Sequence, residues 1–142
     1  MIKICFVCSG NTCRSIMAER LMKKILKIRK ISDVKVSSKG IFATGENITD
    51  NAKAVLKEYK ALASNRKSVK LKKIDKGTLY IVMTENMKDK ILDGKVITMR
   101  ALSGRDITDP FGQSIEVYRQ TASDIMQGIE KLILNITMWR EK

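Results

Sequence analysis

The sequence contains no histidine, which removes several common kinds of active site. Without an imidazole, a serine or cysteine nucleophile cannot be activated by a histidine base, and most zinc sites cannot form. Cysteines are also few: the chain has three, and two of them, Cys8 and Cys13, lie within one short segment. A disulfide framework is therefore not expected, and this cysteine content is typical of a protein in a reducing cytoplasm.

Long apolar runs are missing as well. No segment approaches the roughly 20 apolar residues that a membrane-spanning helix needs, and the first residues lack the basic start and long apolar stretch of a signal peptide. We therefore expect no membrane segment. With 142 residues, 44% of them hydrophobic, the chain is long enough to form one domain, residues 1–142, with a core of its own.

Aromatic residues are scarce, whereas positive charge is abundant. The chain has three Phe, three Tyr and one Trp, and its 28 Lys and Arg against 15 Asp and Glu give a net charge of +13. Such a charge permits binding to nucleic acid, but the few aromatic side chains leave little surface for base stacking. The basic residues are spread along every predicted helix, so we interpret them as a solvated surface that attracts acidic partners, and we do not expect nucleic acid as a partner.

Short apolar segments alternate with amphipathic ones along the chain. Four segments are predicted strands by their apolar or alternating pattern: residues 2–7, 34–38, 78–83 and 95–99. Four others are predicted helices by the spacing of their apolar residues: 16–30, 49–59, 84–92 and 114–140. This alternation predicts an α/β fold, a single-domain three-layer sandwich with a four-stranded parallel sheet and helices on both faces.

The last predicted helix has an apolar stripe of Tyr118, Ala122, Ile125, Ile129, Leu132 and Ile136. We interpret this stripe as core; a seam between two copies is the alternative, so we expect a monomer or a weak dimer. Thr49 and Thr84 are predicted N-caps. Residues 41–47 and 101–112 are expected to be loops, and the basic run 66–73 a solvated loop or a short helix.

The segment Cys8-Ser9-Gly10-Asn11-Thr12-Cys13-Arg14-Ser15 joins the first predicted strand to the first predicted helix. Backbone N–H groups converge at such a junction and form an anion site, and Gly10 would let the backbone curl inward. A thiol held there ionises more readily, so Cys8 is a candidate nucleophile and Arg14 a candidate anion ligand. Ser15 could cap the helix or donate to the thiolate. The alternative is a buried strand cysteine followed by a solvated arginine.

The only proline of the chain follows an aspartate in the loop expected before the last helix. Pro110 restrains the backbone of Asp109, and a rigidly held carboxyl group suits a general acid. Because Asp-Pro is also a common turn signal, a turn without a catalytic role is the alternative. Asp106, in the same loop, is a competing candidate for the acid.

The Cys8–Ser15 segment resembles the phosphate loop of the low-molecular-weight protein tyrosine phosphatases and is most similar to that of the bacterial protein arginine phosphatases. The similarity extends over nearly the whole chain through Met17-Ala18-Glu19, Ser38-Lys39-Gly40-Ile41-Phe42-Ala43 and Asp109-Pro110-Phe111-Gly112. Ile16 is a departure, because the family usually has proline after Arg-Ser. Proline suits the first helical turn, so we expect its absence to affect local rigidity and not the chemistry.

The resemblance implies a cysteine-dependent protein phosphatase that forms a cysteinyl-phosphate intermediate and uses no metal or other cofactor. It implies catalytic roles for Cys8, Arg14 and Asp109, the last as general acid. Phosphate or another oxyanion would be bound by Ser9, Gly10, Asn11, Thr12, Cys13, Arg14 and Ser15. Asn11, Ser15 and Ser38 would hold the loop in shape, although Ser38 could equally be an ordinary serine at a strand end.

The resemblance also bears on the phosphorylated residue. Thr12 and the Phe111-Gly112 pair are similar to the arginine phosphatases, which implies phosphoarginine in proteins as the substrate and phosphotyrosine as the alternative. Thr12 would present a small polar edge beside the nucleophile. Phe42 and Phe111 could flank the planar guanidinium group, but Phe42 could instead fill the core.

Three other hypotheses concern the cysteines and the charge. Oxidised Cys8 could be trapped as a disulfide with Cys13, or Cys13 could simply pack at the helix start. An arsenate reductase of the same architecture would need further cysteines, and none follows Cys13. A non-catalytic module that binds anions or nucleic acid is the rival class, and its binding would weaken steeply with salt.

Overall fold

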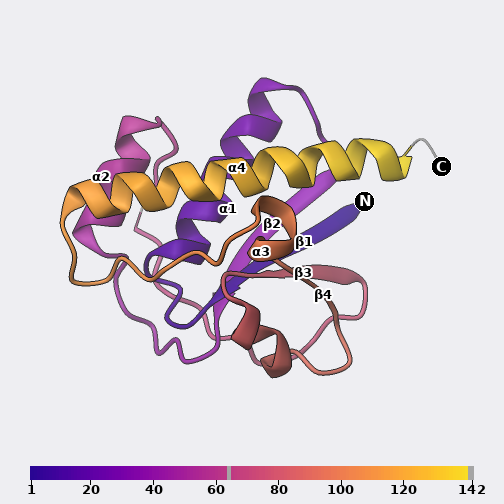
Figure 1. The fold of residues 1–142 in the computed structure, drawn as a ribbon, viewed down its shortest axis with the longest axis horizontal. Coiled ribbons are helices and arrows are strands. Elements are labelled where there is room, and N and C mark those ends of the chain that lie inside the picture. The colour runs from indigo at the N-terminus through magenta and orange to yellow at the C-terminus, as the bar shows by residue number, and fades with distance from the viewer. Residues whose placement is uncertain (64, 141–142) are drawn as a thin grey trace.

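The computed structural model describes residues 1–63 and 65–140, and a parallel sheet of four strands lies at its centre (Figure 1). The strands are β1 (Ile2–Cys8), β2 (Val34–Gly40), β3 (Thr78–Val82) and β4 (Lys95–Thr98). They lie in the order β2-β1-β3-β4, and each neighbouring pair is parallel. The predicted four-stranded parallel sheet is therefore confirmed.

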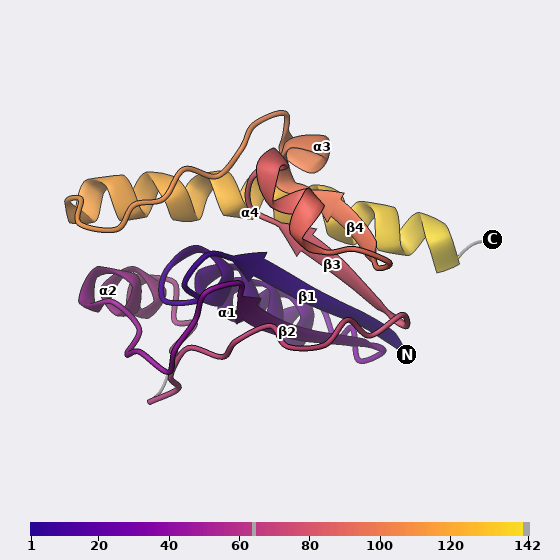
Figure 2. The same cartoon turned by 90° about the horizontal axis from the view of Figure 1, so that it is seen from below.

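The connections put helical elements on both sides of this sheet (Figure 2). α1 (Arg14–Ile28) connects β1 to β2, and the 3₁₀ helix η1 (Glu85–Lys90) connects β3 to β4. Because these crossovers run in opposite directions across the sheet, right-handed connections place α1 and η1 on opposite faces. The remaining helices are α2 (Asp50–Glu58), α3 (Met99–Ser103) and α4 (Ile115–Arg140). Over the described residues, no helix has the length and apolar character needed to cross a membrane.

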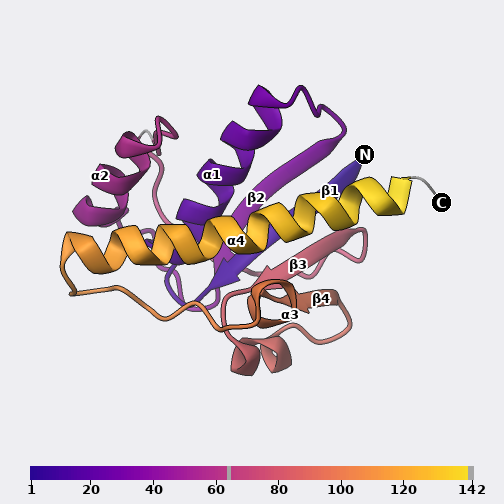
Figure 3. The same ribbon diagram turned by 45° about the horizontal axis from the view of Figure 1, so that its top comes forward.

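The long helix α4 covers much of the core. It crosses the molecule and packs against α1, α2 and α3 (Figure 3). All six residues of its predicted stripe are buried, which confirms that the stripe is core: Tyr118, Ala122, Ile125, Ile129, Leu132 and Ile136. Between them, Gly128 leaves room for the side chain of Met99 from α3.

The helix α3 contradicts the prediction that residues 101–112 form one loop. The Thr98 hydroxyl accepts the Ala101 N–H at 3.0 Å, which caps the helix at its start. Gly104 ends it with φ 85°, a left-handed conformation that suits glycine. The irregular segment between β4 and α4 therefore begins only at Gly104.

Three smaller expectations also need correction. Thr49 and Thr84 occupy N-cap positions as predicted, but neither side chain makes a capping hydrogen bond. The helix expected at 84–92 is the 3₁₀ helix η1. The basic run 66–73 contains no helix, and it is not simply solvated, because Lys67 and Lys70 form isolated bridges with Asn47 and Gly40.

The sheet order places the end of β1 where ligands bind in α/β proteins. The order reverses at β1, and such a switch point opens a crevice at the carboxyl ends of the strands. Cys8 ends β1 there and is paired in register with Gly40 of β2. A Cβ on Gly40 would lie 2.8 Å from both Asn11 N and Gly10 C. The loop that follows β1 is therefore packed directly against the backbone of β2.

We expect Gly40→Ala to lower the free energy of unfolding by about 1–3 kcal/mol, because the added methyl group would overlap loop backbone that cannot rotate away. Urea unfolding followed by circular dichroism measures the change. Gly77→Ala is the matched control, since a Cβ there would meet nothing closer than 3.6 Å. An effect at Gly40 no larger than that at Gly77 would contradict the close packing of loop and strand.

Candidate active site

The loop between β1 and α1 takes its shape from Asn11. Asn11 has φ 56°, a left-handed conformation that asparagine tolerates better than most residues. Gly10, which the sequence suggested for this role, is not in the positive-φ region, and a Cβ there would meet only Thr12 Oγ1 at 3.5 Å. The inward curl of the loop therefore comes from Asn11 and not from Gly10.

The carbonyl groups of the loop are bonded outward. Those of Cys8 and Ser9 accept the backbone N–H groups of Ile41 and Phe42 at 3.0 and 2.8 Å, and that of Thr12 accepts the N–H of Thr49 at 3.1 Å. Because the carbonyl groups are engaged away from the centre, the loop N–H groups are available to an anion at the start of α1.

The thiol of Cys8 lies among donors. Its Sγ accepts the Asn11 backbone N–H at 3.2 Å, and the Ser15 hydroxyl oxygen lies 2.9 Å from it. Both contacts would stabilise a thiolate. Cys5, three residues earlier on the same strand, lies outside the cavity, and burial is the main cause that raises the pKa of its thiol. Ser15 therefore fits the expected role of donor to the sulfur; it does not occupy the N-cap, which is Cys13.

A chain of hydrogen bonds fixes the direction in which Ser15 donates. Glu19, as a carboxylate, accepts the Ser38 hydroxyl proton at 2.9 Å, so the Ser38 oxygen is left to accept from Asn11 Nδ2 at 3.0 Å. The same Asn11 amide donates to Ser15 at 2.7 Å, and the Ser15 proton then has Cys8 Sγ at 2.9 Å as its nearer acceptor and the Lys39 carbonyl oxygen at 3.5 Å as the other. Asn11, Ser15 and Ser38 thus form the buried support that the family resemblance implied.

The sequence analysis assigned no role to Glu19, whose carboxylate anchors this chain of hydrogen bonds. Glu19 is only 2% exposed, and three cations surround it, Arg20 at 3.0 Å, Lys23 at 3.4 Å and Arg66 at 3.8 Å. The cations offset the cost of burying a carboxylate. Arg66 also donates to the Ser38 carbonyl oxygen at 2.7 Å, and burial lowers the pKa of its guanidinium. No local pattern in the sequence pairs residues that lie 47 positions apart (66 minus 19).

Arg14, the first residue of α1, lines the cavity directly after the loop. It is buried, and one guanidinium nitrogen donates to the Ile107 carbonyl oxygen at 2.9 Å. The other terminal nitrogen lies 3.7 Å from a carboxylate oxygen of Asp109. A guanidinium fixed in this way can bind two oxygens of a phosphoryl group.

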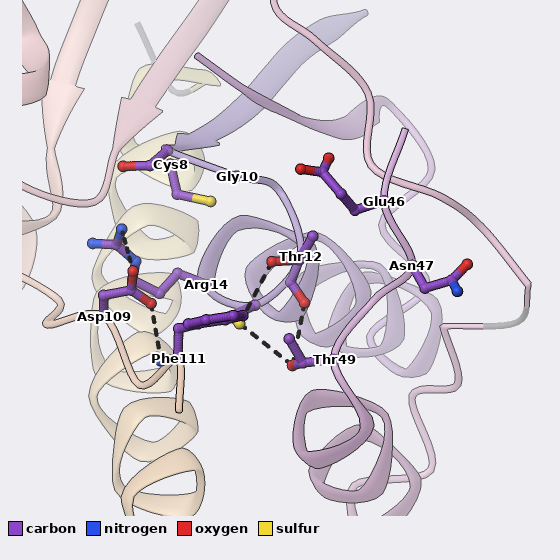
Figure 4. A pocket seen from close by; sticks show the side chains of 11 residues that line it. Cys8, Gly10, Thr12, Arg14, Glu46, Asn47, Thr49, Asp109 and Phe111 are labelled. Atoms are coloured by element: carbon purple, nitrogen blue, oxygen red, sulfur yellow. Dashed lines mark hydrogen bonds and ion pairs between the residues drawn. The ribbon is translucent and has the colours of Figure 1, made fainter. Parts of the chain in front are cut away.

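The two candidate acids have different surroundings. Asp109 lies beside Arg14, and its side chain is half exposed and accepts the Phe111 N–H at 3.1 Å (Figure 4). Asp106 is engaged elsewhere: its carboxylate pairs with Arg100 at 3.0 Å and accepts the Glu85 N–H at 2.9 Å. Only Asp109 lines the cavity that contains Cys8, so the geometry favours it as the acid.

The cavity has a volume of about 340 Å³. Its lining includes five loop residues with Arg14, Asp109 and Phe111, and also three residues for which the sequence suggested no site role, Glu46, Asn47 and Thr49. Phe42 is not part of the lining and is 66% exposed, so it neither fills the core nor flanks the cavity. Across residues 1–63 and 65–140, no group of three His, Cys, Asp or Glu side chains could hold a metal ion.

Cys13 is buried between the loop and α4. Its sulfur lies 3.3 Å from both the Thr49 hydroxyl and the Tyr118 hydroxyl. Burial and the contact with Cys13 raise the pKa of Tyr118 to about 12, so the phenol keeps its proton. These contacts suit the packing hypothesis for Cys13, and all three cysteines are free thiols. A disulfide between Cys8 and Cys13 stays a prediction.

Known proteins match this chain over most of its length. The profile of the family described as "Low molecular weight phosphotyrosine protein phosphatase" matches residues 3–141. The protein-arginine-phosphatase of Geobacillus stearothermophilus is 39% identical over 141 residues, covering 92% of this chain and 93% of that protein. The low molecular weight protein-tyrosine-phosphatase PtpB of Staphylococcus haemolyticus is 32% identical over 142 residues, covering 94% of this chain and 99% of that protein.

Solved structures agree with these matches. The YwlE arginine phosphatase from Geobacillus stearothermophilus superposes with a TM-score of 0.87 at 36% identity, covering 99% of this chain and 96% of that one. A YwlE mutant with a phosphorylated active-site serine superposes with a TM-score of 0.86 at 32% identity, covering 96% of each chain. From the profile, the relatives and the shared fold together, we conclude that this chain belongs to the low molecular weight phosphotyrosine protein phosphatase family.

Proposed function

We propose that this protein hydrolyses phosphoarginine in proteins through a cysteinyl-phosphate intermediate on Cys8. The observation that carries the proposal is the Cys8 sulfur in a cavity with Arg14 and Asp109, where it accepts one backbone N–H and faces one hydroxyl. A thiolate, an anion-binding loop and a carboxyl group are the parts that phosphoryl transfer to cysteine needs.

In the first step, the loop N–H groups and Arg14 bind the phosphoryl oxygens and hold phosphorus in front of Cys8 Sγ. The thiolate attacks phosphorus, the bond from phosphorus to the leaving nitrogen breaks, and Asp109 gives its proton to that nitrogen. Arg14 and the loop dipoles stabilise the charge on the transferring group, which is the part that Mg²⁺ plays in many other phosphoryl transfers.

In the second step, Asp109 has become a carboxylate and takes a proton from water. The water oxygen attacks phosphorus, the bond between sulfur and phosphorus breaks, and phosphate leaves while Cys8 returns to the thiolate. Ser15, 2.9 Å from the sulfur, is placed to donate to the thiolate before the attack and after phosphate leaves, and the Asn11 amide bonded to Ser15 holds it there.

Two observations favour phosphoarginine over phosphotyrosine. The relative with 39% identity is named a protein-arginine-phosphatase, and so is a Bacillus subtilis protein with 34% identity. Thr12 lines the cavity with a small polar side chain, and Phe111 gives it one aromatic wall. Phosphotyrosine is the alternative, because proteins named as tyrosine phosphatases are 30–33% identical.

We further propose phosphorylated proteins as the partners, a cytoplasmic location and a monomer or weak dimer, with all of residues 1–142 in one domain. The mechanism requires Cys8 as a free thiol, which suits a reducing compartment. The abundant positive charge would speed encounters with acidic phosphoproteins. We do not propose nucleic acid as a partner.

Replacing the nucleophile gives the first functional test. Cys8→Ser should abolish turnover of every phosphomonoester and phosphoarginine substrate, because a serine hydroxyl in this loop is a far weaker nucleophile than a thiolate. Steady-state phosphate release measures the loss. Cys5→Ser is the matched control and should retain activity, since Cys5 lies outside the cavity. Turnover that survives in a folded Cys8→Ser variant would overturn the cysteinyl mechanism.

The assignment of the acid has its own pair of variants. Asp109→Asn should lower kcat by about 10²–10⁴, because an amide cannot protonate the leaving group. Asp106→Asn should leave kcat within a few-fold of the wild type, because Asp106 pairs with Arg100 outside the cavity. Both kcat values come from the same assay across pH 5–9. The reverse result would make Asp106 the acid.

Substrate choice is tested with matched peptides. We expect a higher kcat/KM for a phosphoarginine peptide than for the phosphotyrosine peptide of the same sequence, and full activity in EDTA. A preference for phosphotyrosine would select the alternative function. A protein that binds phosphate but turns over neither peptide would be the non-catalytic module.

A further inference from the structure

Glu46 brings a negative charge to the wall of the cavity that is proposed to bind a phosphoryl anion. It belongs to the segment between β2 and α2 and is one of the two carboxylate residues that line the cavity, the other being Asp109. Figure 4 shows these two side chains on opposite sides of the Cys8 sulfur. The two carboxyl groups therefore lie on either side of the space in front of the Cys8 sulfur, where a leaving group would lie.

Local hydrogen bonds hold the carboxylate of Glu46 in place. Its Oε1 accepts the Thr44 backbone N–H at 2.7 Å and the Ser68 hydroxyl at 2.8 Å. Ser68 in turn accepts the backbone N–H of Glu46 at 2.8 Å. These bonds lower the pKa of Glu46 to about 2, and the bond from the Thr44 backbone N–H has the largest effect. The carboxyl group is therefore ionised throughout the working pH range.

Within the described ranges, no lysine or arginine forms an ion pair with Glu46. Glu19, Glu58 and Asp75 all form ion pairs with lysine or arginine, whereas Glu46 forms none. The residue is also exposed, so its charge faces solvent and any ligand in the cavity. A fixed carboxylate in this position repels a phosphate dianion whose leaving group carries no positive charge.

A guanidinium leaving group changes the sign of that interaction. Phosphoarginine has a planar cation bonded directly to the phosphoryl group, with N–H groups that can point to both sides. Carboxylates bind such N–H groups through short charge-assisted hydrogen bonds. The ring of phosphotyrosine offers no N–H donor and no charge, so the same carboxylate would only oppose it.

We propose that Glu46 is a specificity-determining residue whose carboxylate accepts an N–H of the phosphoarginine guanidinium and disfavours aryl phosphates. This inference rests on the proposed function and names what selects its substrate. Asp109 protonates the leaving nitrogen, and Glu46 binds the guanidinium from the other side of the cavity. Phe111 supplies the aromatic wall against which the planar group lies.

A purely structural role for Glu46 would produce a different pattern in variants. Glu46→Gln removes the charge but keeps an oxygen that can accept from Thr44 and Ser68. Ser68→Ala keeps the charge but removes a hydroxyl bonded to both the backbone and the side chain of Glu46. If Glu46 only holds its loop, Ser68→Ala should lower the preference for phosphoarginine more than Glu46→Gln does. If the charge of Glu46 selects the substrate, Glu46→Gln should lower that preference more.

The measured quantity is the ratio of kcat/KM for a phosphoarginine peptide to kcat/KM for the phosphotyrosine peptide of the same sequence. Because the same catalytic groups act on both peptides, the ratio cancels general damage to the chemistry. We expect Glu46→Gln to lower this ratio about five- to tenfold at low salt, with a smaller drop at high ionic strength. Glu58→Gln, which removes a carboxylate from α2 outside the cavity, is the control and should leave the ratio unchanged.

The outcomes separate this inference from the proposed function. A wild-type preference for phosphoarginine that persists within twofold in Glu46→Gln would overturn the role of Glu46 and leave the proposed function intact. An equal or larger drop in Ser68→Ala would likewise overturn it in favour of loop support. Wild-type protein that hydrolyses only phosphotyrosine, or neither peptide, would overturn the proposed function and this inference together.

Discussion

The hydrogen bonds of the Asn11 side chain hold the loop that lines the cavity against three other parts of the chain. They reach Ser15 of α1, Ser38 of β2 and the backbone N–H of Val69 in the basic run. Three bonds from one buried amide offset the cost of its left-handed backbone. Because the same residue donates its own N–H to the Cys8 sulfur, the position of that donor depends on contacts far apart in the sequence.

Glu19 gives this arrangement its polarity. A carboxylate can only accept, so the proton of Ser38 turns toward Glu19 and the Ser38 oxygen accepts from Asn11 Nδ2, which donates its second proton to Ser15 on the side of the sulfur. A buried charge is costly, and Arg20, Lys23 and Arg66 make it tolerable. The basic run from 66 to 73 thus contributes Arg66 and Val69 to the support of the loop, besides its solvated lysines.

The sequence allowed the framework to be predicted because local patterns encode it. The four strands and the stripe of α4 follow from apolar spacing, and the Cys8–Ser15 segment was placed at its strand-to-helix junction. The helix α3 was missed because five residues are too few to show a helical period. The inward curl of the loop was attributed to Gly10, whereas Asn11 supplies it, because tertiary hydrogen bonds of the Asn11 side chain stabilise a left-handed backbone that the sequence does not reveal. Glu19, Arg66 and Glu46 escaped because their contacts with Ser38, Glu19 and Ser68, respectively, join segments that only the folded chain brings together.

The contact between Gly40 and the loop restricts how anything can approach the sulfur. The backbone of β2 lies too close to Asn11 and Gly10 to admit even a methyl group on that side. An incoming phosphorylated side chain cannot approach from the Gly40 side, and the cavity in front of the sulfur is bordered by Asp109, Phe111 and Glu46. In-line displacement within this cavity makes the departing group face outward, toward the carboxyl groups and water, while a strand residue without a side chain closes the opposite side of the loop.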